Sequence, residues 1–231
     1  MLYIISMFLL IIFYISAIYC MKYMKSTRLW NLIFTVSIFV FYLFVVLKVY
    51  SSVGFNDWNF KNTLPVANVS PFMFTLTVVL HIFPLRIKKH IYLLISLLSV
   101  GMLLSALLGC VYNASINYRF HLHFLSDYMA HVMISLWGVY LVRSKQVTPT
   151  IKNTLISGSI IIGVAIVMMM LNVAFDTSFF GLSLNGKHNI YNNVLTDNSY
   201  LSAILYFFGL AAVLTMGFFY SRLLAKEKAD N

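Results

Sequence analysis

The chain has 231 residues, of which 61% are apolar and only 10% are charged. Soluble domains carry about 25% charged residues, so the composition excludes a water-soluble globular protein. The length of the chain leaves no room for a separate soluble catalytic domain beside the apolar segments. The net charge of +10 does not indicate nucleic-acid binding, because most of the cations fall in short connections between apolar segments.

Apolar segments fill most of the chain, and a helix needs about 20 apolar residues to cross the hydrocarbon core of a membrane. The predicted spans cover residues 2–21, 30–50, 70–85, 91–112, 121–142, 154–174 and 198–220. In the first of them the positive charge follows the apolar run, whereas in a signal peptide it precedes the run, so we expect a retained span. The sequence therefore predicts an all-α integral membrane protein, a bundle of about seven transmembrane helices in a single domain over residues 1–231.

Lysine and arginine are concentrated at one side of this predicted bundle. Twelve of the 16 cations follow the odd-numbered spans, at Lys22, Lys25, Arg28, Arg86, Lys88, Lys89, Arg143, Lys145, Lys152, Arg222, Lys226 and Lys228. Short loops rich in these residues stay in the cytoplasm, which predicts an N-terminus outside and a C-terminus inside. We expect a multi-pass protein of the cell membrane that contacts anionic lipids and takes no cofactor.

The third predicted span begins with polar residues at the membrane entrance. Asn68 and Ser70 lie between Pro65 and Pro71, and proline suits the first turn of a helix. Ser70 has two interpretations: a serine that caps the helix, or a hydroxyl at the positive end of the helix dipole, where negative charge is stabilised. Asn68 is a candidate substrate-binding residue.

The fifth predicted span carries the densest group of titratable residues. His123, Asp127 and His131 recur every four residues, which places them on one helix face, and His121 borders that face. We predict that His131 is a general base oriented by Asp127, with His121 and His123 at the substrate. The alternatives are an interhelical polar contact or a metal site, but three ligands along two helical turns suit one ion poorly, so we predict no metal.

The sixth predicted span ends with Asn172, about one turn before Asp176. Both side chains are therefore expected to face the same side of the helix. Asn172 is either a donor in an interhelical hydrogen bond or a contact to the substrate or its oxyanion.

Several short motifs occur in a characteristic order along residues 30–220: Leu64-Pro65, the pair His121 and His131 ten residues apart, Tyr140, Pro149-Thr150, Asn172, and Ser178-Phe179-Phe180-Gly181-Leu182. In these features the chain resembles the YwaF-like bacterial membrane proteins and the related transmembrane protein 164 family. The resemblance implies a membrane enzyme that transfers or hydrolyses acyl groups with a nucleophile and a histidine.

The chain departs from the family pattern at the nucleophile. Where the family motif has His and Cys, this chain has Ala67 and Val69, and Ser178 replaces a second Asn. Three options follow: Ser70 is the nucleophile in a register shifted by one residue, water is activated directly, or the protein is a non-catalytic relative that binds a lipid.

The function that we predict from the sequence is lipid handling by an acyltransferase or ester hydrolase at the outer leaflet. The predicted catalytic residues are His131, Asp127 and Ser70, with Asn172 and Ser178 as donors to the oxyanion. One alternative is a binding protein or transporter for a small or lipidic ligand. Another is a structural subunit that assembles with a partner membrane protein or with further copies of itself.

Overall fold

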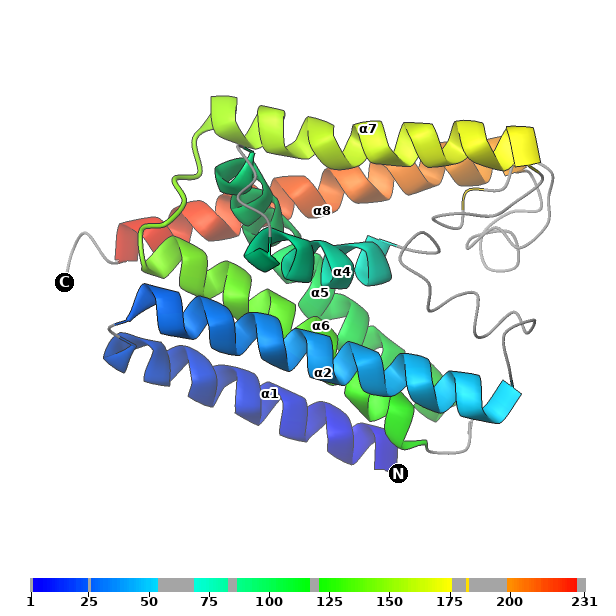
Figure 1. Cartoon of the computed structure of the whole chain (residues 1–231), viewed down its shortest axis with the longest axis horizontal. Helices are drawn as coiled ribbons and strands as arrows, with labels where there is room; N and C mark the ends of the chain where they lie inside the picture. Colours follow the sequence, from blue (N-terminus) through cyan, green and yellow to red (C-terminus); the bar gives the residue numbers. More distant parts are fainter. Residues whose placement is uncertain are drawn as a thin grey trace.

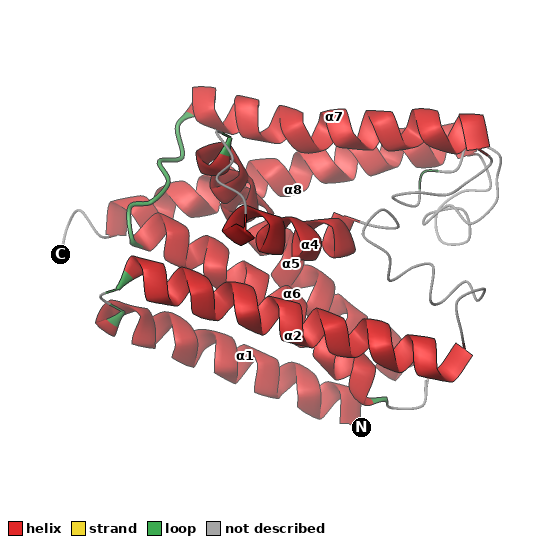
Figure 2. Ribbon diagram, in the orientation of Figure 1, coloured by secondary structure: helices red, strands yellow, loops and turns green. Residues whose placement is uncertain are grey.

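The computed structural model describes residues 2–24, 26–53, 69–82, 87–116, 121–175, 182 and 199–227. Every regular element in these residues is helical (Figure 2). The elements are α1 (Leu2–Cys20), the 3-10 turn η1 (Met21–Tyr23), α2 (Thr27–Val53), α4 (Val69–Ile82), α5 (Lys88–Ser115), α6 (Leu122–Arg143), α7 (Ile151–Phe175) and α8 (Ser199–Glu227). The all-α membrane bundle predicted from the sequence is confirmed.

Six of the described helices are long and apolar enough to cross a membrane: α1, α2, α5, α6, α7 and α8. The remaining predicted span, 70–85, is described as far as residue 82, as helix α4, and its last three residues lie outside the described residues. The 14 described residues of α4 cover about 21 Å at 1.5 Å per residue, compared with about 30 Å for the hydrocarbon core. In Figure 1, α4 begins well short of the ends of α2 and α7.

Helices α1, α2, α7 and α8 run close to the long axis of the bundle, α5 crosses it obliquely, and α1 begins at the end opposite to the one where α8 finishes (Figure 1). We call the end that carries Lys22, Arg28, Lys88, Arg143 and Arg222 the basic end. The other end, where α6 begins, is called the outer end, following the orientation predicted from the positive charges.

Helix α6 is the most enclosed element of the bundle. It packs against α5, α2, α1, α8 and α4, and its side chains are buried continuously from Ala130 to Val142. Because its neighbours separate it from lipid, α6 does not need an apolar surface. It can therefore carry a histidine, a serine and a tryptophan through the membrane.

Hydrogen bonds fix the position of α6 among its neighbours. At the basic end Asn31 of α2 donates from Nδ2 to Gln146 Oε1 (2.7 Å), and Trp137 Nε1 donates to Asn31 Oδ1 (2.9 Å). Nearer the middle, the Tyr14 hydroxyl of α1 lies 3.1 Å from the Ser135 Oγ. Because an unsatisfied polar group in hydrocarbon is costly, these contacts restrict how far α6 can slide or rotate.

Helices α5 and α6 touch through small residues. Ser96 Oγ donates to the Gly138 carbonyl oxygen at 3.1 Å, and a Cβ placed on Gly138 would lie 2.9 Å from the Ile95 carbonyl oxygen. Small residues of this kind let helix backbones approach closely in membranes.

We therefore expect Gly138→Ala to destabilise the bundle, because the added methyl meets backbone atoms of α5 that cannot move aside independently. A loss of about 1–3 kcal/mol is typical of overpacking, and thermal unfolding in detergent measures it. The matched control is Gly163→Ala in α7, where a Cβ has nothing within 4 Å, so that helix propensity alone should leave stability unchanged or slightly raised. Equal effects of the two substitutions would contradict the close approach of α5 and α6.

Candidate functional site

His131 lies inside the bundle on the third turn of α6. It is nine residues beyond Leu122, the first residue of the helix, which places it about 13–14 Å along the axis from the outer end of α6. Only 6% of the residue is exposed. A buried imidazole needs hydrogen-bond partners on its two nitrogens, and the structure supplies both.

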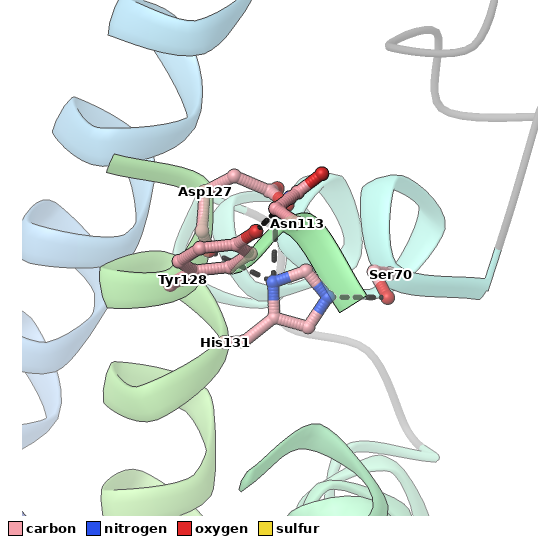
Figure 3. A network of polar contacts seen from close by, with 5 residues as sticks. All are labelled: Ser70, Asn113, Asp127, Tyr128 and His131. Atoms are coloured by element: carbon pink, nitrogen blue, oxygen red, sulfur yellow. Dashed lines mark hydrogen bonds and ion pairs between the residues drawn. The ribbon is translucent and has the colours of Figure 1, made fainter. Parts of the chain in front are cut away.

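The first partner is Ser70, from the start of α4. His131 Nε2 lies 2.8 Å from Ser70 Oγ (Figure 3). Ser70 is the second described residue of α4. Its contact with His131 joins two helices through residues that are 61 positions apart in sequence.

The second partner is the backbone of Asp127. His131 Nδ1 lies 2.8 Å from the Asp127 carbonyl oxygen, whereas the nearest carboxylate oxygen, Oδ1, is 3.6 Å away. The structure thus differs from the sequence-based expectation in the atom involved: the carbonyl makes the hydrogen bond, and the carboxylate is a neighbouring charge. The Asp127 side chain is 37% exposed, so it retains contact with the surroundings of the bundle.

These two contacts determine which way the Ser70–His131 hydrogen bond runs. A carbonyl oxygen only accepts, so His131 Nδ1 must carry the hydrogen and donate it to Asp127. In the neutral imidazole Nε2 then has a free lone pair, and the Ser70 hydroxyl donates to it. A serine that donates to a histidine nitrogen is the arrangement of a nucleophile and its general base.

Two further polar residues border this pair, and the sequence did not single them out. Asn113, near the outer end of α5, donates from Nδ2 to the Tyr128 hydroxyl oxygen at 2.5 Å. The Tyr128 ring lies against Gly109, where an added Cβ would be 2.7 Å from Tyr128 Cε1. This contact ties α5 to the turn of α6 that precedes His131 (Figure 3). A tyrosine in an apolar span gives no sequence signal for such a role.

The two outer histidines lie apart from the Ser70–His131 pair. His121 is the N-cap residue of α6, and its ring stacks on that of His123 with centroids 5.3 Å apart. The His123 ring also packs on Phe124 at 4.3 Å. Because the histidine pair sits at the entrance of the helix and His131 eight to ten residues deeper, about 12–15 Å along the axis, the three imidazoles do not form one cluster.

The remaining predicted site residues have other surroundings or lie outside the description. Asn172, which is 1% exposed, donates from Nδ2 to the Leu182 carbonyl oxygen at 3.1 Å. Leu182 lies outside the helices, so this contact is neither the interhelical hydrogen bond nor the oxyanion contact that the sequence suggested. Asn68 and Ser178 lie outside the described residues. Within the residues that are described, no three His, Cys, Asp or Glu side chains are grouped closely enough to hold a metal ion.

No family model, curated protein or solved structure matches this chain. The resemblance to the YwaF-like proteins consequently stays a prediction, and the site has to be interpreted from its own geometry.

The geometry predicts that Asp127→Asn leaves the tautomer of His131 unchanged, because the substitution keeps the backbone carbonyl that accepts from Nδ1. Where a carboxylate itself holds the Nδ1 hydrogen, the same substitution produces the wrong tautomer and lowers the rate about 10⁴-fold. The ¹⁵N chemical shifts of the imidazole, in protein labelled at histidine, report which nitrogen carries the hydrogen. A switch to the Nε2–H form in the Asp127→Asn protein would show that the carboxylate, and not the carbonyl, sets the tautomer.

Proposed function

We propose that this chain is a serine-dependent acyltransferase or ester hydrolase that acts on a lipid ester at the outer leaflet of the cell membrane. The observation that supports the proposal is the 2.8 Å contact between Ser70 Oγ and His131 Nε2, with His131 Nδ1 held by the Asp127 carbonyl. Of the three options left open by the missing cysteine, this contact favours Ser70 as the nucleophile.

The chemistry follows from the direction of the hydrogen bond. Ser70 Oγ attacks the carbonyl carbon of the ester while its proton passes to His131 Nε2. The C–O bond to the leaving alcohol then breaks, and that alcohol takes the proton from Nε2, which leaves the acyl group on Ser70. Water or a second alcohol, deprotonated by the same nitrogen, then attacks the acyl carbon. The bond from that carbon to Ser70 Oγ breaks, Oγ takes the proton back from Nε2, and the acyl group leaves as an acid or as a new ester.

The first turn of α4 supports the negative charge that develops on the carbonyl oxygen. The first amides of an α-helix have no partner within the helix, and the N-terminus carries the positive end of the helix dipole. Ser70 is the second described residue of α4, so the attacked carbonyl would be close to the positive end of this dipole. Pro71, the next residue, has no N–H to donate, so the dipole is the contribution that we assign to this turn. Dipoles directed at the place where charge develops contribute strongly to catalysis.

The depth of the pair favours a lipid over a water-soluble ester. His131 lies about 13–14 Å along α6 from its outer end, on a helix long enough to cross the membrane. The cations of the chain are concentrated at the opposite, basic end. A substrate that already resides in the outer leaflet reaches this depth without leaving the membrane, whereas a polar solute would have to be desolvated.

An alkyl fluorophosphonate tests the proposal without knowledge of the natural substrate. Its phosphorus is attacked by an activated serine, fluoride leaves, and a stable Ser–O–P bond remains. We expect labelling of Ser70 in the protein reconstituted in lipid, none in Ser70→Ala, and a labelling rate lowered about 10²- to 10⁴-fold in His131→Ala, the usual contribution of a general base. Mass spectrometry of the labelled peptide identifies the serine.

The matched control is Ser135→Ala. It removes a buried hydroxyl from α6 one turn beyond His131, where the partner is Tyr14 and not the imidazole, so labelling should persist. If Ser70 is not labelled and Ser70→Ala merely lowers the melting temperature, the Ser70–His131 contact is an interhelical hydrogen bond. Such bonds are worth about 0.6 kcal/mol on average in membranes, and the binding or structural alternative would then replace the enzyme.

A further inference from the structure

Ser70 is not the only residue of α4 that contacts His131. Phe74 follows Ser70 by four residues, so the two lie on the same face of α4. The Phe74 ring stands perpendicular to the imidazole of His131, with centroids 5.1 Å apart and an interplanar angle of 89°. Phe74 itself is 1% exposed. One face of one short helix therefore carries both the hydroxyl and an aromatic wall for the imidazole.

The two hydrogen bonds of His131 select one of the two flipped positions of its ring, because a 180° turn would place carbon atoms where Nδ1 and Nε2 meet their partners. The terminal torsion of a histidine is nevertheless broad, so smaller tilts about it would lengthen the contact of Nε2 with Ser70. A ring packed at right angles against the imidazole restricts these tilts, because an edge-to-face pair is favoured and a tilted one loses contact.

Phe74 has a second aromatic neighbour. Tyr42 of α2 packs on Phe74 with ring centroids 5.4 Å apart and an interplanar angle of 54°. Aromatic contacts therefore link α2 to α4 and α4 to α6. Since α2 and α6 are also joined by the Asn31–Trp137 hydrogen bond at the basic end, Phe74 lies between helices whose relative position is already fixed.

We propose that Phe74 is a positioning residue that keeps Nε2 of His131 directed at Ser70. This inference rests on the proposed function, because it concerns the readiness of the same nucleophile. Phe74 packs on the imidazole and has no group that could transfer a proton or bond to the ester. It acts through the orientation of the imidazole, so its removal should lower the rate of attack by Ser70 and leave the affinity for an alkyl probe unchanged.

The test compares Phe74→Leu with Phe34→Leu. Phe34 is a matched control, since it is 3% exposed and packs on a ring of α6, that of Tyr140, at 5.6 Å, nine residues from His131. Both variants lose a buried ring and should melt at lower temperature. The maximal labelling rate with the alkyl fluorophosphonate should fall about 10- to 100-fold in Phe74→Leu only, the size expected for a catalytic group misplaced by about 1 Å. The probe concentration at half-maximal rate should not change.

The ¹⁵N spectrum of His131 gives a second readout that does not depend on labelling. We expect a single Nδ1–H tautomer in the wild type and in Phe34→Leu, and a mixture of tautomers in Phe74→Leu. If Phe74→Leu does not fold, Phe74→Met replaces it, because an unbranched side chain fills the space more adaptably. The proposal is overturned if the Phe74 variant keeps the wild-type labelling rate and the wild-type tautomer of His131. It is also overturned if the Phe74 and Phe34 variants lose labelling rate equally. A wild-type protein that is never labelled, but whose tautomer changes without Phe74, refutes the proposed function and retains the positioning role.

Discussion

Polar side chains that cross a membrane must be enclosed by protein, and α6 shows how much of this fold follows from that constraint. The helix carries His131 and Ser135 within its buried stretch, and an unsatisfied polar group in hydrocarbon would cost several kcal/mol. The neighbouring helices α1, α2, α4, α5 and α8 surround α6, and they supply its partners: Tyr14 for Ser135, and Ser70 for His131. The apolar faces of α1 and α7 are left for lipid.

The position of α4 meets the same constraint. Its described residues start at Val69, inward from the ends of α2 and α7 (Figure 1), so Ser70 comes to the depth of a side chain three turns into α6. The Ser70 hydroxyl and the His131 imidazole are hydrogen-bond partners there, where either group alone would be costly.

The long helices could be predicted from the sequence because apolar length alone determines a membrane span: the predicted span 91–112 corresponds to α5 at Lys88–Ser115, and the span 154–174 to α7 at Ile151–Phe175. The local site was only partly predictable. Spacing along α6 shows that Asp127 and His131 share a face, but spacing carries no information on whether the carbonyl or the carboxylate of Asp127 meets Nδ1. The contact of Phe74 with His131 could not be predicted either, since a phenylalanine is common in any apolar span.

The use of a backbone carbonyl to hold Nδ1 changes what the site requires of its sequence. The carbonyl oxygen of the residue four positions earlier is present beside every histidine on a helix, whatever that residue is. A suitable rotamer of His131 and a wall to maintain it are then sufficient to leave Nε2 free for Ser70. A search of the sequence for an acidic third member would select Asp127 for its carboxylate, although its main-chain oxygen makes the hydrogen bond. The orientation of the His131 imidazole then depends on the packing between α4 and α6 and not on an ionisable residue. Such packing requires only that the side chains be apolar and of the right size.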